Sequence, residues 1–155
     1  MKVLISLYLA VVFSLCSFSQ SLVGTWQANT PSIYSAYLST YRFFPDGTFR
    51  YNTNEFDGLH RIISIGGDYK TLNYQIEFVP RYTIEIEGGS IQRDSLSTSS
   101  DTWSIIGGQI KKIPIQSPEP YLVQFFFPNS ESESTCVVID SRKYFLIDLT
   151  HNDLE

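Results

Sequence analysis

The amino-acid sequence predicts an all-β protein, built as a single antiparallel up-and-down β-barrel of about eight to ten strands. Apolar and polar residues alternate along most of the chain after residue 20, which places one face of each strand against a core. Gly, Pro, Asn, Asp and Ser recur between these stretches about every 8 to 12 residues, as they do in barrels and sandwiches. A barrel accommodates such strands most simply, because closure of the sheet removes its exposed edges.

The first element, residues 1–19, has the layout of a cleaved signal peptide. Lys2 precedes an apolar run, and small polar residues follow it. The run is short for a transmembrane helix, which requires about 20 residues. We expect cleavage before Gln20, leaving residues 20–155 as one domain that is secreted or periplasmic and has no integral membrane span. Lipid anchoring at Cys16 is not expected, because a large leucine precedes it where lipoprotein signals carry a small residue.

The charge of the chain argues against nucleic acid as a partner, and its cysteine content argues against an intrachain disulfide. The formal net charge is −5, and no Lys/Arg stripe of any length occurs. Since binding to a phosphate backbone depends on clustered cations, nucleic acid is not expected as a partner. Only Cys136 remains after cleavage, so no intrachain disulfide is expected. The apolar neighbours of Cys136 indicate a buried thiol rather than a nucleophile.

The first three strands are expected in residues 22–52. "LVGTWQA" has the composition of a strand, and "YLSTYRFF" and "TFRYNT" form a hairpin around "PDG". In that turn Pro45 presets its own φ, and Gly47 can adopt a positive φ. One face of the hairpin is expected to carry four aromatic side chains, namely Tyr41, Phe43, Phe49 and Tyr51.

The middle of the chain is expected to form several shorter strands separated by glycine pairs. Gly66-Gly67 is expected to interrupt the strands, and "DYKTLNYQIEFV" (residues 68–79) alternates as one strand. Gly88-Gly89 and Gly107-Gly108 are expected to form hairpin turns. Pro114 indicates an edge or a strand end, because proline cannot donate to a strand ladder.

Two further segments complete the expected barrel. "YLVQFFF" (residues 121–127) is the most apolar strand of the chain. "TCVVI" and "YFLIDL" are expected to form a closing hairpin around the turn "DSRK" at residues 140–143.

The stretch "LVGTW", followed by "YRFFPDGTFRY", resembles the lipocalin-like proteins of the calycin superfamily, in particular the short secreted lipocalin-like domains of bacteria. The resemblance implies that Gly24 relieves crowding near the closed end of the barrel and that Trp26 plugs that end. The hairpin from Phe44 to Phe49 is also common in such domains.

Aromatic side chains are the best candidates for a ligand site. They make up 15% of the chain, and tyrosine offers a flat apolar body with a polar tip. The alternative is that they fill the barrel as core residues. The expected inward, ligand-lining positions are Tyr41, Phe43, Phe49, Tyr51, Tyr74 and Phe125.

No metal site, cofactor or catalytic activity is expected. His60 and His151 lack a recognised ligand spacing with the neighbouring aspartates, and no third ligand is apparent. The sequence contains no nucleophile elbow, no metalloprotease motif and no phosphate-binding glycine loop. The protein is therefore not expected to be an enzyme.

The expected function is that of a binding protein that holds a small, largely apolar ligand inside the barrel without turnover. The alternative is a protein-interaction module, such as an inhibitor or an envelope partner, whose filled barrel presents the loops 29–35, 54–60 and 95–101. A third possibility is an enzyme with its site at the barrel mouth.

Overall fold

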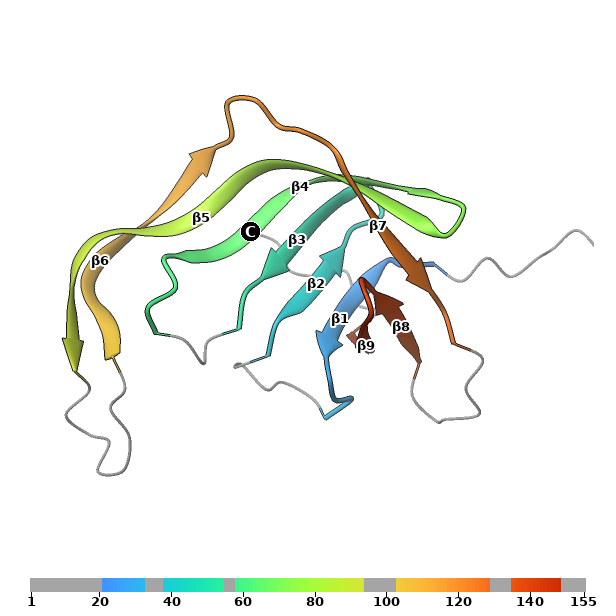
Figure 1. Cartoon of the computed structure of the whole chain (residues 1–155), viewed down its shortest axis with the longest axis horizontal. Coiled ribbons are helices and arrows are strands. Elements are labelled where there is room, and N and C mark those ends of the chain that lie inside the picture. The colour runs from blue at the N-terminus through green and yellow to red at the C-terminus, as the bar shows by residue number, and fades with distance from the viewer. Residues whose placement is uncertain (1–20, 33–37, 55–57, 94–102, 129–134, 149–155) are drawn as a thin grey trace, which may run out of the picture.

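Alternating apolar residues build nine strands in the described part of the chain, all joined in one sheet (Figure 1). The computed structural model describes residues 21–32, 38–54, 58–93, 103–128 and 135–148. The expected signal peptide and His151 lie outside these ranges, as do the whole loop 95–101 and parts of the loops 29–35 and 54–60. The strands are β1 (Gly24–Ala28), β2 (Thr40–Phe43), β3 (Thr48–Asn52), β4 (Ile62–Leu72), β5 (Gln75–Arg93), β6 (Trp103–Pro114), β7 (Tyr121–Phe126), β8 (Cys136–Ile139) and β9 (Arg142–Asp148).

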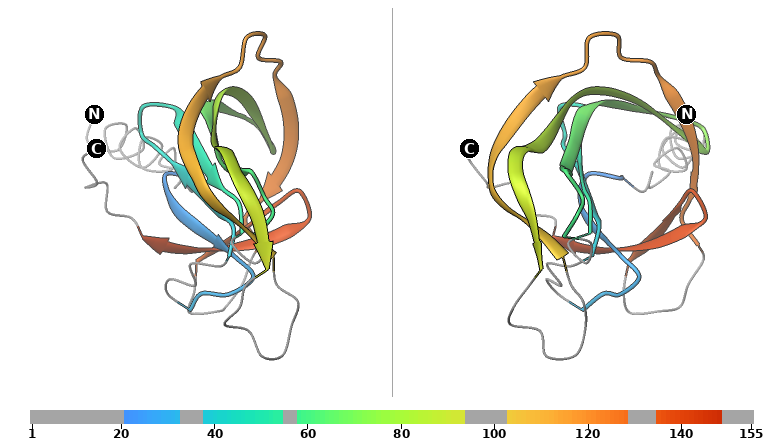
Figure 2. Two further views of the ribbon diagram at one scale, coloured as in Figure 1. Left: turned by 90° about the vertical axis from the view of Figure 1, so that its left-hand side faces the viewer. Right: turned by 60° about the vertical axis from the view of Figure 1, so that its left-hand side comes forward.

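Eight of these strands close into an antiparallel up-and-down barrel. The sheet order is β4-β3-β2-β1-β9-β8-β7-β5, and pairing of β4 with β5 completes the ring. Every pair of neighbours is antiparallel. Figure 2 looks into this ring of strands in its right-hand view. The expected all-β fold and its antiparallel closed barrel are confirmed.

The ninth strand, β6, extends the sheet beyond the ring. β5 is long enough to pair with β7 through Gln75–Phe78 and with β6 through Tyr82–Arg93, along the same edge. The two expected glycine turns lie inside these strands, with Gly88 paired to Gly108, so the prediction of hairpin turns there is wrong. Gly88, Gly89 and Gly107 do adopt φ near +75° (73°, 73° and 75°), but the chain continues without reversing.

Gly66 and Gly67 also lie inside a strand rather than at a break. A register shift between them marks a β-bulge in the pairing of β4 with β5. A Cβ atom on Gly66 would overlap the ring of Tyr82, and one on Gly67 would overlap the carbonyl oxygen of Val79. These glycines are therefore needed for the close approach of β5, which the sequence pattern alone did not distinguish from a strand end.

The expected single strand at residues 68–79 is instead two strands joined by a tight turn. Asn73 adopts a φ of 56° in this turn, and β5 begins at Gln75. Tyr74 is 77% exposed, so its expected inward position is wrong. Apolar residues also alternate through the turn. Because the turn residues face solvent, this alternation does not reflect a strand with one buried face.

The β2–β3 hairpin forms as expected. Gly47 adopts a φ of 83°, and the Asp46 carboxylate accepts a 2.9 Å hydrogen bond from the Thr48 backbone N–H. Tyr41 pairs with Tyr51 and Phe43 pairs with Phe49, so the four aromatic side chains share one face.

One end of the barrel carries the short β2–β3 and β4–β5 turns, and we call it the turn end. Trp26 is buried there, and its ring lies 6.1 Å from that of Phe127. Gly24, two residues earlier, adopts a φ of 132°, which residues with a Cβ atom rarely adopt. The opposite end, which we call the loop end, carries the β1–β2, β3–β4 and β8–β9 connections.

Candidate functional site

The aromatic residues predicted to face inward divide into two groups. Phe43, Phe49 and Phe125 are buried, and they belong to the same core cluster as Trp26. Tyr41 and Tyr51 are only partly buried and pack against that cluster from the loop end. The structure thus brings five of the six predicted residues into the barrel, and Tyr74 lies outside it.

The turn-end half of the barrel is filled by phenylalanine rings. The Phe49 and Phe78 ring centroids are 4.7 Å apart in an edge-to-face arrangement, and those of Phe43 and Phe78 are 6.1 Å apart. Phe78 is fully buried among them. Such contacts are typical of a packed core, so Phe43 and Phe49 stabilise the barrel rather than line an open cavity.

Four tyrosines gather above this core, toward the loop end, and we call them the tyrosine cluster: Tyr41, Tyr51, Tyr121 and Tyr144. The Tyr41 ring centroid lies 4.6 Å from that of Tyr51 and 5.2 Å from that of Tyr144. Phe78 forms the floor, with its ring centroid 5.7 Å from Tyr41 and 5.4 Å from Tyr121. The strands β2, β3, β7 and β9 each contribute one of these tyrosines, so the cluster joins the β2–β3 hairpin to two strands that lie far from it in the sequence.

Sequence reasoning missed Tyr121 and Tyr144. Tyr144 lies on β9, and its backbone pairs with Val137 of β8, which is also buried. Period-two alternation in "KYFLIDL" was the available signal for Tyr144. Tyr121 begins β7 and gave no such signal, because its inward direction depends on how β7 joins β5.

Burial raises the pKa of three phenols of the cluster. It is the largest cause of the raised pKa of Tyr41, to which the neighbouring Tyr144 and Tyr121 add. Burial also raises the pKa of Tyr121 and of Tyr144, and for Tyr144 the side chains of Arg142 and Ser39 act in the opposite direction. Neutral phenols can both donate and accept hydrogen bonds, so the cluster offers polar contacts without charge.

The cluster reaches the surface at Tyr121. Tyr144 is 4% exposed, whereas Tyr121 is 44% exposed. β8 pairs with β7 only at Phe125 and Phe126, so no described strand covers the edge of β7 at Tyr121 on that side. Within the described residues, the barrel wall is therefore open beside Tyr121.

A hollow of about 470 Å³ adjoins the cluster at the loop end of β4. Ile65, one of its lining residues, pairs with Tyr51 across β3 and β4. Arg61 closes the hollow against β5, because its guanidinium donates hydrogen bonds of 3.0 and 2.8 Å to the carbonyl oxygens of Ile86 and Gly88. Leu59 and Ile62 add partly exposed apolar surface to the same hollow. The loop end thus combines apolar surface with phenol hydroxyls.

Other kinds of site find little support in the described ranges. His60 lines the hollow, but among the residues that the structure describes there is no group of three or more His, Cys, Asp or Glu side chains that could hold a metal ion. Cys136 is buried. The same residues include no helix that is long and apolar enough to cross a membrane.

Fold and site together define an antiparallel β-barrel protein with a filled turn end and a tyrosine-lined loop end. Comparison of the chain with family models finds no match, and no curated protein and no solved structure is significantly similar to it.

Proposed function

We propose that this protein is a lipocalin-like binding protein that holds a small, largely apolar, ring-containing ligand at the tyrosine cluster without turning it over. The observation that carries the proposal is the cluster itself, four tyrosines of which two pack against Phe78, open to solvent at Tyr121. Export by the signal peptide at residues 1–19 would place the protein in the periplasm or outside the cell.

The binding energy would come from removal of apolar ligand surface from water, at about 25 cal/mol per Å². The ligand would enter at the loop end, because the rings of Phe43, Phe49 and Phe78 fill the other half. Tyrosine rings favour stacked or edge-to-face contacts with a ligand ring, and their hydroxyls would fix its orientation.

Native mass spectrometry of the purified protein tests for a ligand carried over from expression. A titration with the neutral dye N-phenyl-1-naphthylamine tests whether the site is accessible. Tyr121→Ala should weaken dye binding about tenfold, because it removes the exposed wall of the cluster. The matched control Tyr74→Ala removes an exposed tyrosine outside the barrel and should leave dye binding unchanged.

The alternative function, a protein-interaction module, predicts a different result. The loops 29–35, 54–60 and 95–101 would then carry the contacts; the last of them and parts of the other two lie outside the described residues. Neither a bound small molecule nor dye binding would be observed, and that pair of results would overturn the proposed ligand site.

A further inference from the structure

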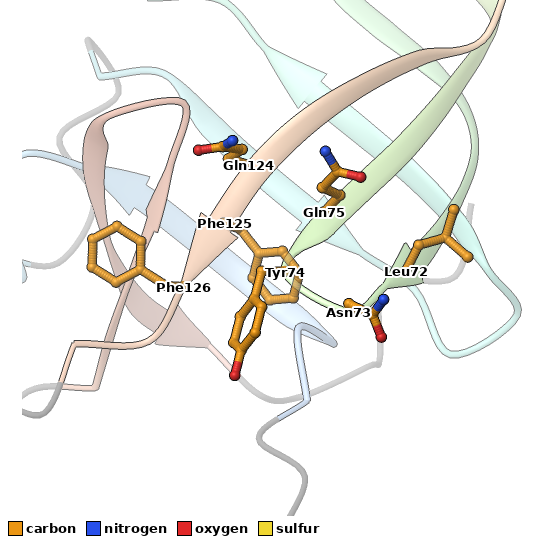
Figure 3. A pocket seen from close by; sticks show the side chains of 7 residues that line it. All are labelled: Leu72, Asn73, Tyr74, Gln75, Gln124, Phe125 and Phe126. Carbon is orange, nitrogen blue, oxygen red and sulfur yellow. The ribbon is translucent and has the colours of Figure 1, made fainter.

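A second, separate groove lies on the outside of the barrel, between the β4–β5 turn and β7 (Figure 3). It has a volume of about 430 Å³. Leu72 and Tyr74 border it at the turn, and Phe126 borders it on β7. The Tyr74 and Phe126 side chains are 77% and 51% exposed, which is high for large aromatic residues in a folded domain. Two aromatic rings are therefore available to a ligand there.

Side-chain amides supply the polar part of the groove. Gln75 and Gln124 are register partners on β5 and β7, and Asn73 lies in the adjoining turn. Over the ranges that the structure describes, these three amides and the Tyr74 hydroxyl make no hydrogen bond to other protein groups. Each amide carries two donors and an acceptor, so the groove presents several free hydrogen-bonding groups beside its rings.

The groove carries no charge. All of its lining residues are neutral. Glu77, two residues after Gln75, is paired with Lys70 at 2.8 Å and so offers no free carboxylate. An ionic ligand would lack a counter-charge here, which disfavours phosphates, carboxylates and metal ions.

A peptide strand would also lack its usual partner in the groove. Peptides that join a sheet pair with an unpaired strand edge. Here β5 is paired on both edges, with β4 and with β7, over Gln75–Phe78. The groove therefore offers side chains rather than backbone groups to a ligand.

From these features we infer that the outer groove binds a neutral saccharide. A sugar ring has apolar C–H faces that stack on aromatic rings and hydroxyl groups that match amide donors and acceptors. Tyr74 and Phe126 would take the ring faces, while Gln75, Gln124 and Asn73 would bond the hydroxyls. This site is independent of the proposed ligand in the tyrosine cluster.

Calorimetric titration of the purified protein with cellohexaose, maltohexaose and chitohexaose tests the inference, with hexagalacturonate as the charged comparison. At least one neutral oligosaccharide should bind more tightly than hexagalacturonate. Tyr74→Ala and Gln124→Ala should each weaken that binding about tenfold. The matched control Trp103→Ala removes an exposed aromatic ring on β6 and should leave binding unchanged. Tyr121→Ala should also leave it unchanged, so the two proposed sites can fail separately.

Three outcomes would overturn the saccharide site. The first is saturation by none of the three neutral oligosaccharides. The second is an equal loss of affinity in Trp103→Ala and Tyr74→Ala. The third is binding of an uncharged Ala/Tyr hexapeptide, sensitive to Tyr74→Ala, in the absence of oligosaccharide binding, which would identify a peptide groove instead. A thermal melt of each variant checks that it is folded, and the exposure of Tyr74 favours a wild-type melt.

Discussion

The indole Nε1 of Trp26 donates a 2.6 Å hydrogen bond to the carbonyl oxygen of Leu22. This bond ties the segment before β1 to the core at the turn end of the barrel, where Leu22 is itself buried. Both groups would be costly to bury without a partner. The Gly-x-Trp step therefore acts in folding, and the phenols at the other end of the barrel are better placed for a ligand.

Trp26→Ala is expected to lower the free energy of unfolding by about 3–5 kcal/mol, as loss of a large core aromatic does. Trp26→Phe keeps part of the packing and leaves the Leu22 carbonyl without its donor, so a smaller loss is expected. Urea unfolding followed by circular dichroism measures both. Trp103→Ala, at an exposed position, is the control and should cost less than about 0.5 kcal/mol. A loss below about 1 kcal/mol for Trp26→Ala would contradict the plug role.

A charge placed among the core rings should prevent folding. Phe43→Asp would bury an unpaired carboxylate beside Phe78 and Tyr69, at a cost of about 4 kcal/mol or more. That is comparable with the whole stability of a small domain, which is about 5–15 kcal/mol. The matched control Ile110→Asp lies on β6, where the side chain is 69% exposed, and should retain the wild-type circular dichroism melt. An unchanged melt for Phe43→Asp would mean that this position faces water.

Alkaline pH should destabilise the protein through Tyr41. Burial raises the pKa of Tyr41 above its ordinary value of 10.0, so the unfolded chain loses this proton before the folded protein does. The contribution of Tyr41 to the free energy of unfolding is therefore fully present below about pH 10, and it is lost as the pH rises above this value. Unfolding in urea at about pH 8 and about pH 11 measures the slope of the free energy of unfolding against pH. Tyr41→Phe should reduce the slope, whereas Tyr74→Phe, in the exposed turn, should keep the wild-type slope; equal slopes in all three proteins would refute this.

Local chemistry made the β2–β3 hairpin predictable from the sequence. Pro45 and Gly47 specify its turn, and two-residue alternation then fixes the face on which Phe43 and Phe49 lie. The tyrosine cluster was only half predictable. Tyr121 and Tyr144 join Tyr41 because closure of the barrel brings together strands that are distant in the sequence. Local alternation carries no information about which strands become neighbours across the barrel.

The glycine pairs were mispredicted for a related reason. A glycine pair can end a strand or can let a neighbouring strand approach closely, and only the neighbour decides between these. Gly88 faces open space, whereas a Cβ atom on Gly67 would overlap the Val79 carbonyl oxygen across the sheet. The sequence around both pairs has the same character, so pattern alone does not separate them.

Gly67→Ala tests the close approach of β4 and β5 at the bulge. The new methyl group would meet backbone atoms of Val79, Pro80 and Arg81, which cannot rotate away as a flexible side chain would. Displacing β5 here would strain the pairing that closes the barrel, and we expect a loss of about 2 kcal/mol or more in the free energy of unfolding. Gly88→Ala is the matched control: its added methyl group meets no atom within 4 Å, and only its φ of +73° opposes the change. That strain is about 1 kcal/mol, as for other single residues in the left-handed region. Urea unfolding of the two variants should therefore rank Gly67→Ala as the less stable, and the reverse order would show that β5 can yield at the bulge.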